Sequence, residues 1–208
     1  MIGKDFRRRL MGVGKGEEPE PAPEGVVWYD NLVFSDNTAF LNTGVSVQGV
    51  EFEWEVEWKR TSLVNDIYPF EKDGYDTNRD LRIGVRRYYG PTPYCYYLYH
   101  NSTGTGINAS PGLNSPSTFV VTRNNGEYTL SCNGASYSVS AVRDAATPLI
   151  FSPGSTWTVR RSIITINGVI VQSLRPCTYY GEAGMWDVVN EVFIGNAAQS
   201  GNFTVVND

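Results

Sequence analysis

The chain has 208 residues and a formal net charge of −5, so it is long enough for one large domain with a substantial apolar core, and its charge argues against nucleic acid as a partner. It contains 21 Gly and 13 Tyr, which is typical of strands and turns rather than helices. No apolar run approaches the roughly 18 residues of a membrane span, and no hydrophobic stretch follows the basic N-terminus, so we expect neither a membrane partner nor a secretory signal.

Residues 1–25 have the composition of an arm rather than of a globular domain. Residues 17–25 are acidic and rich in proline, which predicts an extended linker that cannot join a core. Two interpretations of the preceding basic stretch remain open: a disordered tail, or a peptide that folds onto a partner and anchors the chain. In the second case, one helical turn would place apolar and basic side chains together for anchoring, namely Phe6, Arg7, Arg8, Arg9 and Leu10.

The globular domain is expected over residues 26–208. It opens with predicted strands at 26–34 and 38–48, joined by a turn at Ser35-Asp36-Asn37. Further on, the polar stretches 66–80 and 101–116 are predicted to be loops. Strands are expected between them, over 81–89 and 94–100.

The most regular pattern in the chain lies at residues 50–59. Polar and apolar residues alternate there without a break, which predicts a β-strand with one buried and one polar face. Large aromatic side chains on the buried face require a second sheet opposite, so we expect a β-sandwich with this strand at its centre. The buried face would hold Phe52, Trp54, Val56 and Trp58, and the polar face Glu51, Glu53, Glu55 and Glu57.

Asn-Gly pairs between alternating runs predict hairpin turns at Asn125-Gly126, Asn133-Gly134 and Asn167-Gly168. No stretch combines helix caps with a helical period over about ten residues, so the fold class is predicted to be all-β. The cysteines are too few and too far apart for a disulfide framework or a zinc site. Cys95, Cys132 and Cys177 are therefore expected to be buried free thiols of a protein made in a reducing cytoplasm.

The last third of the chain carries an ordered series of landmarks: Asn167 to Val171, Leu174 to Cys177, Gly184, Asp187, Val189, Asn190, Phe193, Asn196, and Gly201 to Thr204. This series resembles the closing segment of laminin-G-like, concanavalin A-like domains in structural proteins of gut bacteriophages. The stretches TRNNGEYTLSCNG and VEFEWEVEWKRTS resemble a hairpin and the opening core strand of the same family. The resemblance covers roughly residues 26–206. It implies a jelly-roll sandwich and a virion setting, and no defined ligand.

The block around Asp187 is expected to be structural. Asp and Asn side chains can close local turns there by accepting hydrogen bonds from backbone amides. Trp186, Val189 and Phe193 would fill the open edge between the two sheets, and Phe203 and Val205 would return as an edge strand.

The glutamates allow a catalytic hypothesis. Glu53, Glu55 and Glu57 resemble the E-x-D-x-E strand of sandwich glucanases, and same-face neighbours on a strand lie about 6.5–7 Å apart, close to a two-carboxylate spacing. However, Arg82 and Arg86 alternate along the predicted strand 81–89 and are the expected ion-pairing partners. A carboxylate that faces an arginine stays ionised and cannot serve as a general acid. An ion-paired, solvated strand face is therefore the preferred interpretation.

Two further candidate sites lie in the middle of the chain. Asp76, Asn78 and Asp80 place oxygen ligands at alternate loop positions, which is one way to bind calcium, although such loops are more often simple turns. On the strand 94–100, Tyr94, Tyr96 and His100 are expected to point away from the core, where tyrosines can stack on sugars or form a subunit contact.

The sequence therefore predicts a non-enzymatic virion accessory protein without a cofactor, calcium excepted. Its arm would dock on other capsid or tail proteins, and its sandwich would be displayed outward, as a homo-oligomer, either as decoration or as an adhesin for a surface glycan. Two alternatives stay open: a carbohydrate-active hydrolase that uses Glu53 and Glu57, and a purely structural module that packs against copies of itself.

Overall fold

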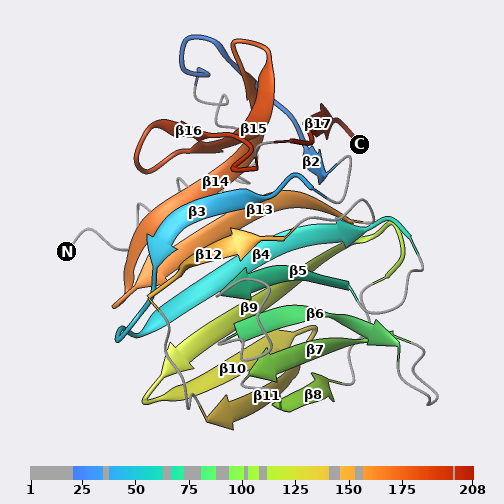
Figure 1. Ribbon diagram of the computed structural model, residues 1–208, viewed down its shortest axis with the longest axis vertical. Helices are drawn as coiled ribbons and strands as arrows, with labels where there is room; N and C mark the ends of the chain where they lie inside the picture. The colour runs from blue at the N-terminus through green and yellow to red at the C-terminus, as the bar shows by residue number, and fades with distance from the viewer. Residues whose placement is uncertain are drawn as a thin grey trace.

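The computed structural model describes residues 21–34, 38–62, 67–72, 81–87, 94–100, 103–107, 112–140, 146–152, 157–198 and 200–208. These residues form antiparallel strands and no helix, so no helix that could cross a membrane occurs among them. The strands make an 11-stranded and a 6-stranded sheet, and in Figure 1 the smaller sheet lies in front of the larger one. This architecture confirms the predicted fold class, an all-β jelly-roll sandwich of two sheets.

The larger sheet has the strand order β11-β10-β9-β4-β13-β14-β15-β16, with β1 paired to β14 and with β2 paired to both β13 and β17. Its strands are β1 (Val26–Trp28), β2 (Asn31–Phe34), β4 (Phe52–Arg60), β9 (Pro116–Asn124), β10 (Glu127–Cys132), β11 (Ala135–Ser140), β13 (Trp157–Ile166), β14 (Val169–Tyr179), β15 (Glu182–Asp187), β16 (Val192–Ile194) and β17 (Phe203–Val206).

The smaller sheet has the order β3-β12-β5-β6-β7-β8. Its strands are β3 (Leu41–Ser46), β5 (Ile67–Lys72), β6 (Leu81–Arg87), β7 (Tyr94–His100), β8 (Thr103–Ile107) and β12 (Pro148–Phe151). The chain therefore passes back and forth between the two sheets as it runs from β2 to β13.

Strand β4 occupies the centre of the larger sheet, as its alternation predicts. It pairs with β9 on one side and with β13 on the other. Every second residue from Phe52 to Arg60 is buried, and the residues between them are half-buried. The predicted ion-pairing strand is wrong, because β6, which carries Arg82 and Arg86, belongs to the other sheet and pairs with β5 and β7.

Phe70, on strand β5 of the smaller sheet, is at the centre of the aromatic contacts between the two sheets. Its ring centroid lies 5.5 Å from that of Trp58, 4.8 Å from that of Phe119 and 5.4 Å from that of Trp157. Trp54 and Phe151 complete the shell around it at 5.9 and 5.5 Å. All of these rings are at most 1% exposed, so the aromatic face of β4 is covered as its sequence requires.

The predicted hairpins are confirmed at all of the Asn-Gly pairs. Asn125, Asn133 and Asn167 have φ values of 49°, 47° and 49°, and the glycine after each also has positive φ. Positive φ at both central residues defines the type I′ turn that matches the twist of antiparallel strands. A further hairpin, between β14 and β15, was not predicted, because its turn is Tyr180-Gly181 and tyrosine is not a turn residue.

Several sequence-based boundaries are wrong. Residues 67–72 and 103–107, predicted to be loops, form the strands β5 and β8. Pro69 and the glycines in 103–107 weaken the strand pattern, and only pairing with neighbours stabilises these segments. The first predicted strand is divided into β1 and β2 of the larger sheet, the second contains β3 of the smaller sheet, and the turn at 35–37 lies outside the described residues.

The block around Asp187 closes turns as predicted. Its Oδ1 accepts hydrogen bonds from the amides of Ser173 and Val189, and Asn190 Nδ2 donates to its Oδ2 at 2.6 Å. Phe203 returns as part of β17, which pairs with β2. The predicted place of Trp186 and Phe193 is wrong, because they belong to a second apolar cluster, separate from the inter-sheet core.

The cysteine prediction is confirmed for the described thiols. Cys132 and Cys177 are free and buried, and burial raises the pKa of Cys132 to about 11 and that of Cys177 to about 12. A thiol with such a pKa is rarely the reactive thiolate, so these side chains act as small apolar groups. The Cys95 side chain lies outside the described set.

The substitution Phe70→Ala is expected to lower the free energy of unfolding by about 3–5 kcal/mol, because it opens a cavity at the contact between the sheets. Urea unfolding followed by tryptophan fluorescence would measure the change. Val169→Ala is the matched control, since its side chain is 63% exposed and should cost less than about 0.5 kcal/mol. Equal losses in the two variants would show that Phe70 is not central to the core.

Candidate functional site

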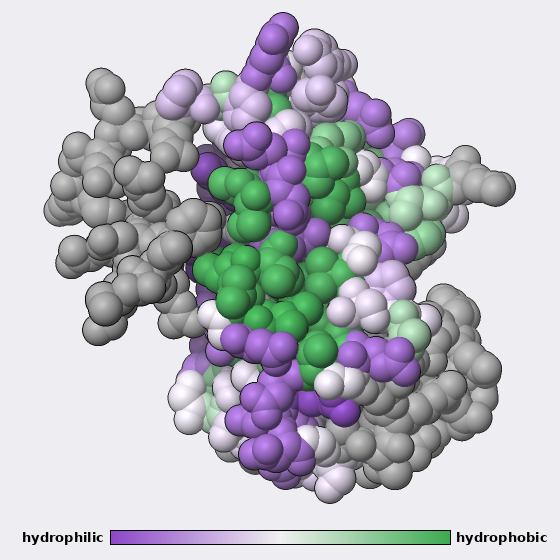
Figure 2. All heavy atoms as spheres, turned by 90° about the vertical axis from the view of Figure 1, so that its left-hand side faces the viewer, coloured by the Kyte–Doolittle hydropathy of each residue, from purple (hydrophilic) through white to green (hydrophobic). Residues whose placement is uncertain are grey.

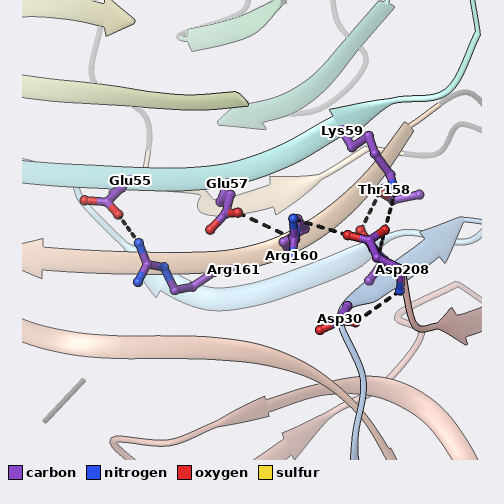
Figure 3. Close-up of polar contacts among 9 residues, drawn as sticks. Asp30, Glu55, Glu57, Lys59, Thr158, Arg160, Arg161 and Asp208 are labelled. Carbon is purple, nitrogen blue, oxygen red and sulfur yellow. Dashed lines mark hydrogen bonds and ion pairs between the residues drawn. The ribbon is translucent and has the colours of Figure 1, made fainter. Parts of the chain in front are cut away.

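The outer face of the larger sheet carries a row of ion pairs (Figure 3). Arg161 Nη2 lies 2.6 Å from Glu55 Oε1, and Arg160 Nε lies 3.5 Å from Glu57 Oε1. Both arginines come from β13, where the register with β4 shifts between Val159 and Arg161. This bulge places two consecutive arginines beside β4, an arrangement that alternation along a regular strand cannot produce.

The row continues to Asp208. Its carboxylate lies 2.6 Å from Lys59 Nζ and 3.3 Å from Arg160 Nη1, and Asn31 Nδ2 donates to it at 3.0 Å. The hydrogen bond from Lys59, followed by that from Asn31, holds the pKa of Asp208 below its ordinary value. The amide of Asp208 donates to Asp30 Oδ2 at 3.1 Å, so the segment after β17 is fastened to β2 and β4.

The preferred interpretation of the glutamates, an ion-paired strand face, is confirmed for Glu55 and Glu57, although their arginine partners differ from the predicted ones. The paired side chains are about a quarter exposed, for example 26% for Arg161 and 27% for Glu55. Partly solvated pairs of this kind contribute at most about 1 kcal/mol each. They fix the register of β4 against β13 and leave neither carboxylate in the apolar surroundings that a general acid requires.

The predicted tyrosine face is wrong for Tyr96. Its side chain is fully buried, and its hydroxyl oxygen accepts a hydrogen bond from Trp58 Nε1 at 2.9 Å. Burial raises the pKa of Tyr96 far above its ordinary value, even though hydrogen bonds from Trp58 and Ser117 oppose the shift. Leu98 is buried as well, so the described side chains of this strand face the core, where Tyr96 finds a polar partner. The side chains of Tyr94 and His100 lie outside the described set.

The predicted calcium loop and the anchoring arm both lie outside the described residues, which do not include 1–20 or 73–80. Among the residues that are described, no group of three or more His, Cys, Asp or Glu side chains could hold a metal ion. Asp76, Asn78 and Asp80 therefore stay a prediction, as do Phe6 to Leu10.

An aromatic cluster that the sequence did not predict covers the outer face of the sheet around β1, β14, β15 and β16. The centroid of the Tyr179 ring lies 5.5 Å from that of Trp186 and 5.4 Å from that of Phe193. Arg175 lies over the ring of Trp28, 4.6 Å from its centroid. At the end of this cluster, Tyr180 is 70% exposed. Each of these strands contributes one aromatic residue, and the strands pair only in the folded chain, so no periodic signal in the sequence could have predicted the cluster.

A second surface is aliphatic. The face shown in Figure 2, the left-hand side of Figure 1, carries hydrophobic side chains near its middle. Strands β4, β13 and β14 have ends on this side, and Val169, at the β13–β14 turn, is 63% exposed. The neighbouring Val50, Ile166 and Val171 are only partly buried and pack against the core. Arg123 Nη1 donates a hydrogen bond to Val50 O at 3.2 Å at this surface.

Comparisons with known proteins add little to this geometry. No family model matches the chain, and no curated protein matches it by sequence. Galectin LEC-6 from Caenorhabditis elegans has 11% identity and a TM-score of 0.42, covering 70% of this chain and 99% of that chain. The heptameric SAP-like pentraxin from Limulus polyphemus has 9% identity and a TM-score of 0.43, covering 71% of each chain.

The carbohydrate binding module CBM66 from Bacillus subtilis has 11% identity and a TM-score of 0.38, covering 65% of this chain and 91% of that chain. Identities and TM-scores this low carry no argument about function. The candidate site must therefore be judged on its own residues.

The substitution Tyr96→Phe is expected to lower the free energy of unfolding by about 1–3 kcal/mol, because the buried Trp58 N–H loses its acceptor while the ring still fills its space. Tyr137→Phe is the matched control, since its side chain is 36% exposed. Chemical denaturation of both variants would test the difference. A neutral Tyr96→Phe would show that water or another group replaces the lost acceptor.

The substitution Asp208→Asn is expected to lower stability near neutral pH, and this loss is expected to shrink as pH falls below the ordinary pKa of an aspartate. The folded-state pKa of Asp208 is depressed, so its contribution is present above the unfolded-state pKa and is lost as pH falls through the folded-state value. Thermal unfolding across this pH range would measure it. Glu191→Gln, at an exposed turn residue, is the control and should not reproduce the pH dependence. A Tm difference that persists unchanged at low pH would contradict the charge-based account.

Proposed function

We propose that this protein is a non-enzymatic virion accessory protein whose sandwich is displayed and whose residues 1–25 attach it to capsid or tail proteins. The resemblance of its sequence to domains of gut phage structural proteins supports the virion setting. The displayed domain would act in adhesion, with a surface glycan as the ligand class, and would work as a homo-oligomer.

One observation carries the non-enzymatic part of this proposal. Glu57, one of the two carboxylates of the hydrolase alternative, is paired with Arg160, and Glu55, between it and Glu53, is paired with Arg161 on a half-buried sheet face. A hydrolase of the two-carboxylate type needs one carboxyl group that stays protonated next to a sugar. The arginines supply the opposite environment. The row therefore supports a structural role for this face.

The contacts at the start of the described chain support an arm that leaves the sandwich at one place. The amide of Val26 donates to Pro23 O at 3.0 Å, and the amide of Tyr180 donates to Gly25 O at 2.9 Å. Strand β1 then pairs with β14. These bonds fasten residues 23–28 to the sheet, so a peptide that precedes them is tethered at the β14–β15 hairpin.

The test is attachment to particles that lack the protein. The full chain is expected to bind in a pelleting assay, and a chain that starts at Val26 is expected to stay in the supernatant. Replacing Arg7, Arg8 and Arg9 by Ser should weaken binding and make it less sensitive to salt, because the arginines would contact acidic groups of the partner. A full chain with Glu17, Glu18 and Glu20 replaced by Gln is the control and should still attach.

Two outcomes would contradict the proposal. Equal attachment of both chains would place the virion contact on the sandwich itself. Failure of the full chain to attach, while it elutes as a well-folded protein, would remove the arm from an anchoring role.

A further inference from the structure

The turn of the β14–β15 hairpin differs in sequence from the Asn-Gly turns of the β9–β10, β10–β11 and β13–β14 hairpins. The Asn-Gly turns place an asparagine at the first central position, where φ is positive: Asn125, Asn133 and Asn167. Asparagine tolerates this left-handed conformation, whereas a bulky aromatic residue rarely adopts it. At the equivalent position of the fourth turn stands Tyr180, with φ of 47°. A disfavoured residue in a turn that asparagine would fill better indicates a role for the ring itself.

The ring of Tyr180 packs against neighbouring residues and is still exposed to solvent. The amide of Tyr180 donates to Gly25 O at 2.9 Å. A Cβ on Gly25 would lie 2.8–3.0 Å from three ring carbons of Tyr180, so the glycine backbone packs directly against the ring. The Tyr179 ring lies beside it, with centroids 4.6 Å apart and planes at 64°. The Tyr180 side chain nevertheless remains 70% exposed. A rigid, solvated aromatic ring loses little conformational entropy when a ligand stacks on it.

The surroundings restrict the ligand class. Glu24 precedes the glycine that packs against the ring, Glu182 follows Tyr180 by two residues, and both are exposed. A nucleic acid or an anionic membrane would therefore meet acidic residues on the segments that hold the ring. A two-residue turn is also far smaller than the roughly 800 Å² per partner of a stable protein interface. A small neutral ring with C–H groups on one face and hydroxyls at its edge fits both limits. Its C–H groups would lie on the electron-rich face of the tyrosine ring, and its hydroxyls would donate to carboxylates or to the tyrosine hydroxyl.

We propose that Tyr180, supported by Gly25 and Tyr179, is the stacking platform for a neutral saccharide ring. This site is separate from the predicted strand tyrosines and from the outer glutamate row. The inference deepens the adhesin function proposed above and rests on the glycan-binding part of it, but not on the attachment of the arm.

The test is Tyr180→Asn, which converts the turn to the Asn-Gly pair found in the other hairpins. It removes the ring and the unfavourable conformation together, so the variant is expected to fold with equal or higher Tm. The intact chain and the variant would be applied to an array of neutral hexose and N-acetylhexosamine oligosaccharides, followed by titration of the best-bound one. A loss of at least about tenfold in affinity is expected, corresponding to about 1.4 kcal/mol.

Tyr180→Phe is the matched control, since it keeps the stacking face and should stay within about threefold of the parent affinity. Tyr137→Asn removes a partly exposed tyrosine from another strand and should leave saccharide binding unchanged. Saccharide binding that survives Tyr180→Asn would overturn the proposal, as would an array to which the parent chain does not bind. A large fall in Tm on Tyr180→Asn would also overturn it, because the ring would then be a structural clamp on Gly25.

The particle attachment assay separates these failures from failure of the virion function. Tyr180→Asn should attach to particles as well as the parent does, because the arm is intact. Loss of saccharide binding with attachment retained supports the platform, whereas loss of both would show that the β14–β15 hairpin serves the arm and would overturn it.

Discussion

The whole structure depends on covering the aromatic face of β4. A strand that presents Trp54 and Trp58 on one side can be stable in water only if a second layer lies over that side, and Phe70 supplies its centre from the other sheet. The indole N–H groups of both tryptophans are also satisfied: Trp54 Nε1 donates to Ser162 Oγ, and Trp58 Nε1 donates to the Tyr96 hydroxyl. The position of Tyr96 therefore follows from the needs of β4 rather than from the pattern of its own strand.

The opposite face of β4 shows how the same alternation yields an ion-paired surface. The bulge in β13 brings Arg160 and Arg161 next to Glu57 and Glu55, and Asp208 extends the row to the last strand. Each pair is modest because it is partly solvated. Together they favour one register of β4 against β13, where a one-residue slip would turn the tryptophans outward.

The hairpin turns show that either local sequence or tertiary contacts can set the backbone conformation. Where the chain needs only a hairpin, it uses Asn-Gly, and local chemistry alone specifies the geometry. Where it uses Tyr180 in the same conformation, local preference is overridden, and the neighbouring Gly25 is the residue that makes room for the ring. A residue whose backbone conformation conflicts with its intrinsic preference, such as Tyr180, is therefore the first place on the surface to look for a functional role.

The sequence by itself determined the all-β class, the centre of the sandwich at β4, the Asn-Gly hairpins and the hydrogen-bonded turn at Asp187, because each of these depends on alternation or on the chemistry of a few adjacent residues. Only the tertiary structure decided which arginines meet the glutamates, that residues 67–72 and 103–107 are strands, that Tyr96 lies inside, and that Tyr180 stands at an exposed tip. The physical reason is that these features arise from pairing between segments far apart in the chain, including a bulge and a glycine contact. Such pairings are set by the packing of two sheets and leave no periodic signal in either segment alone.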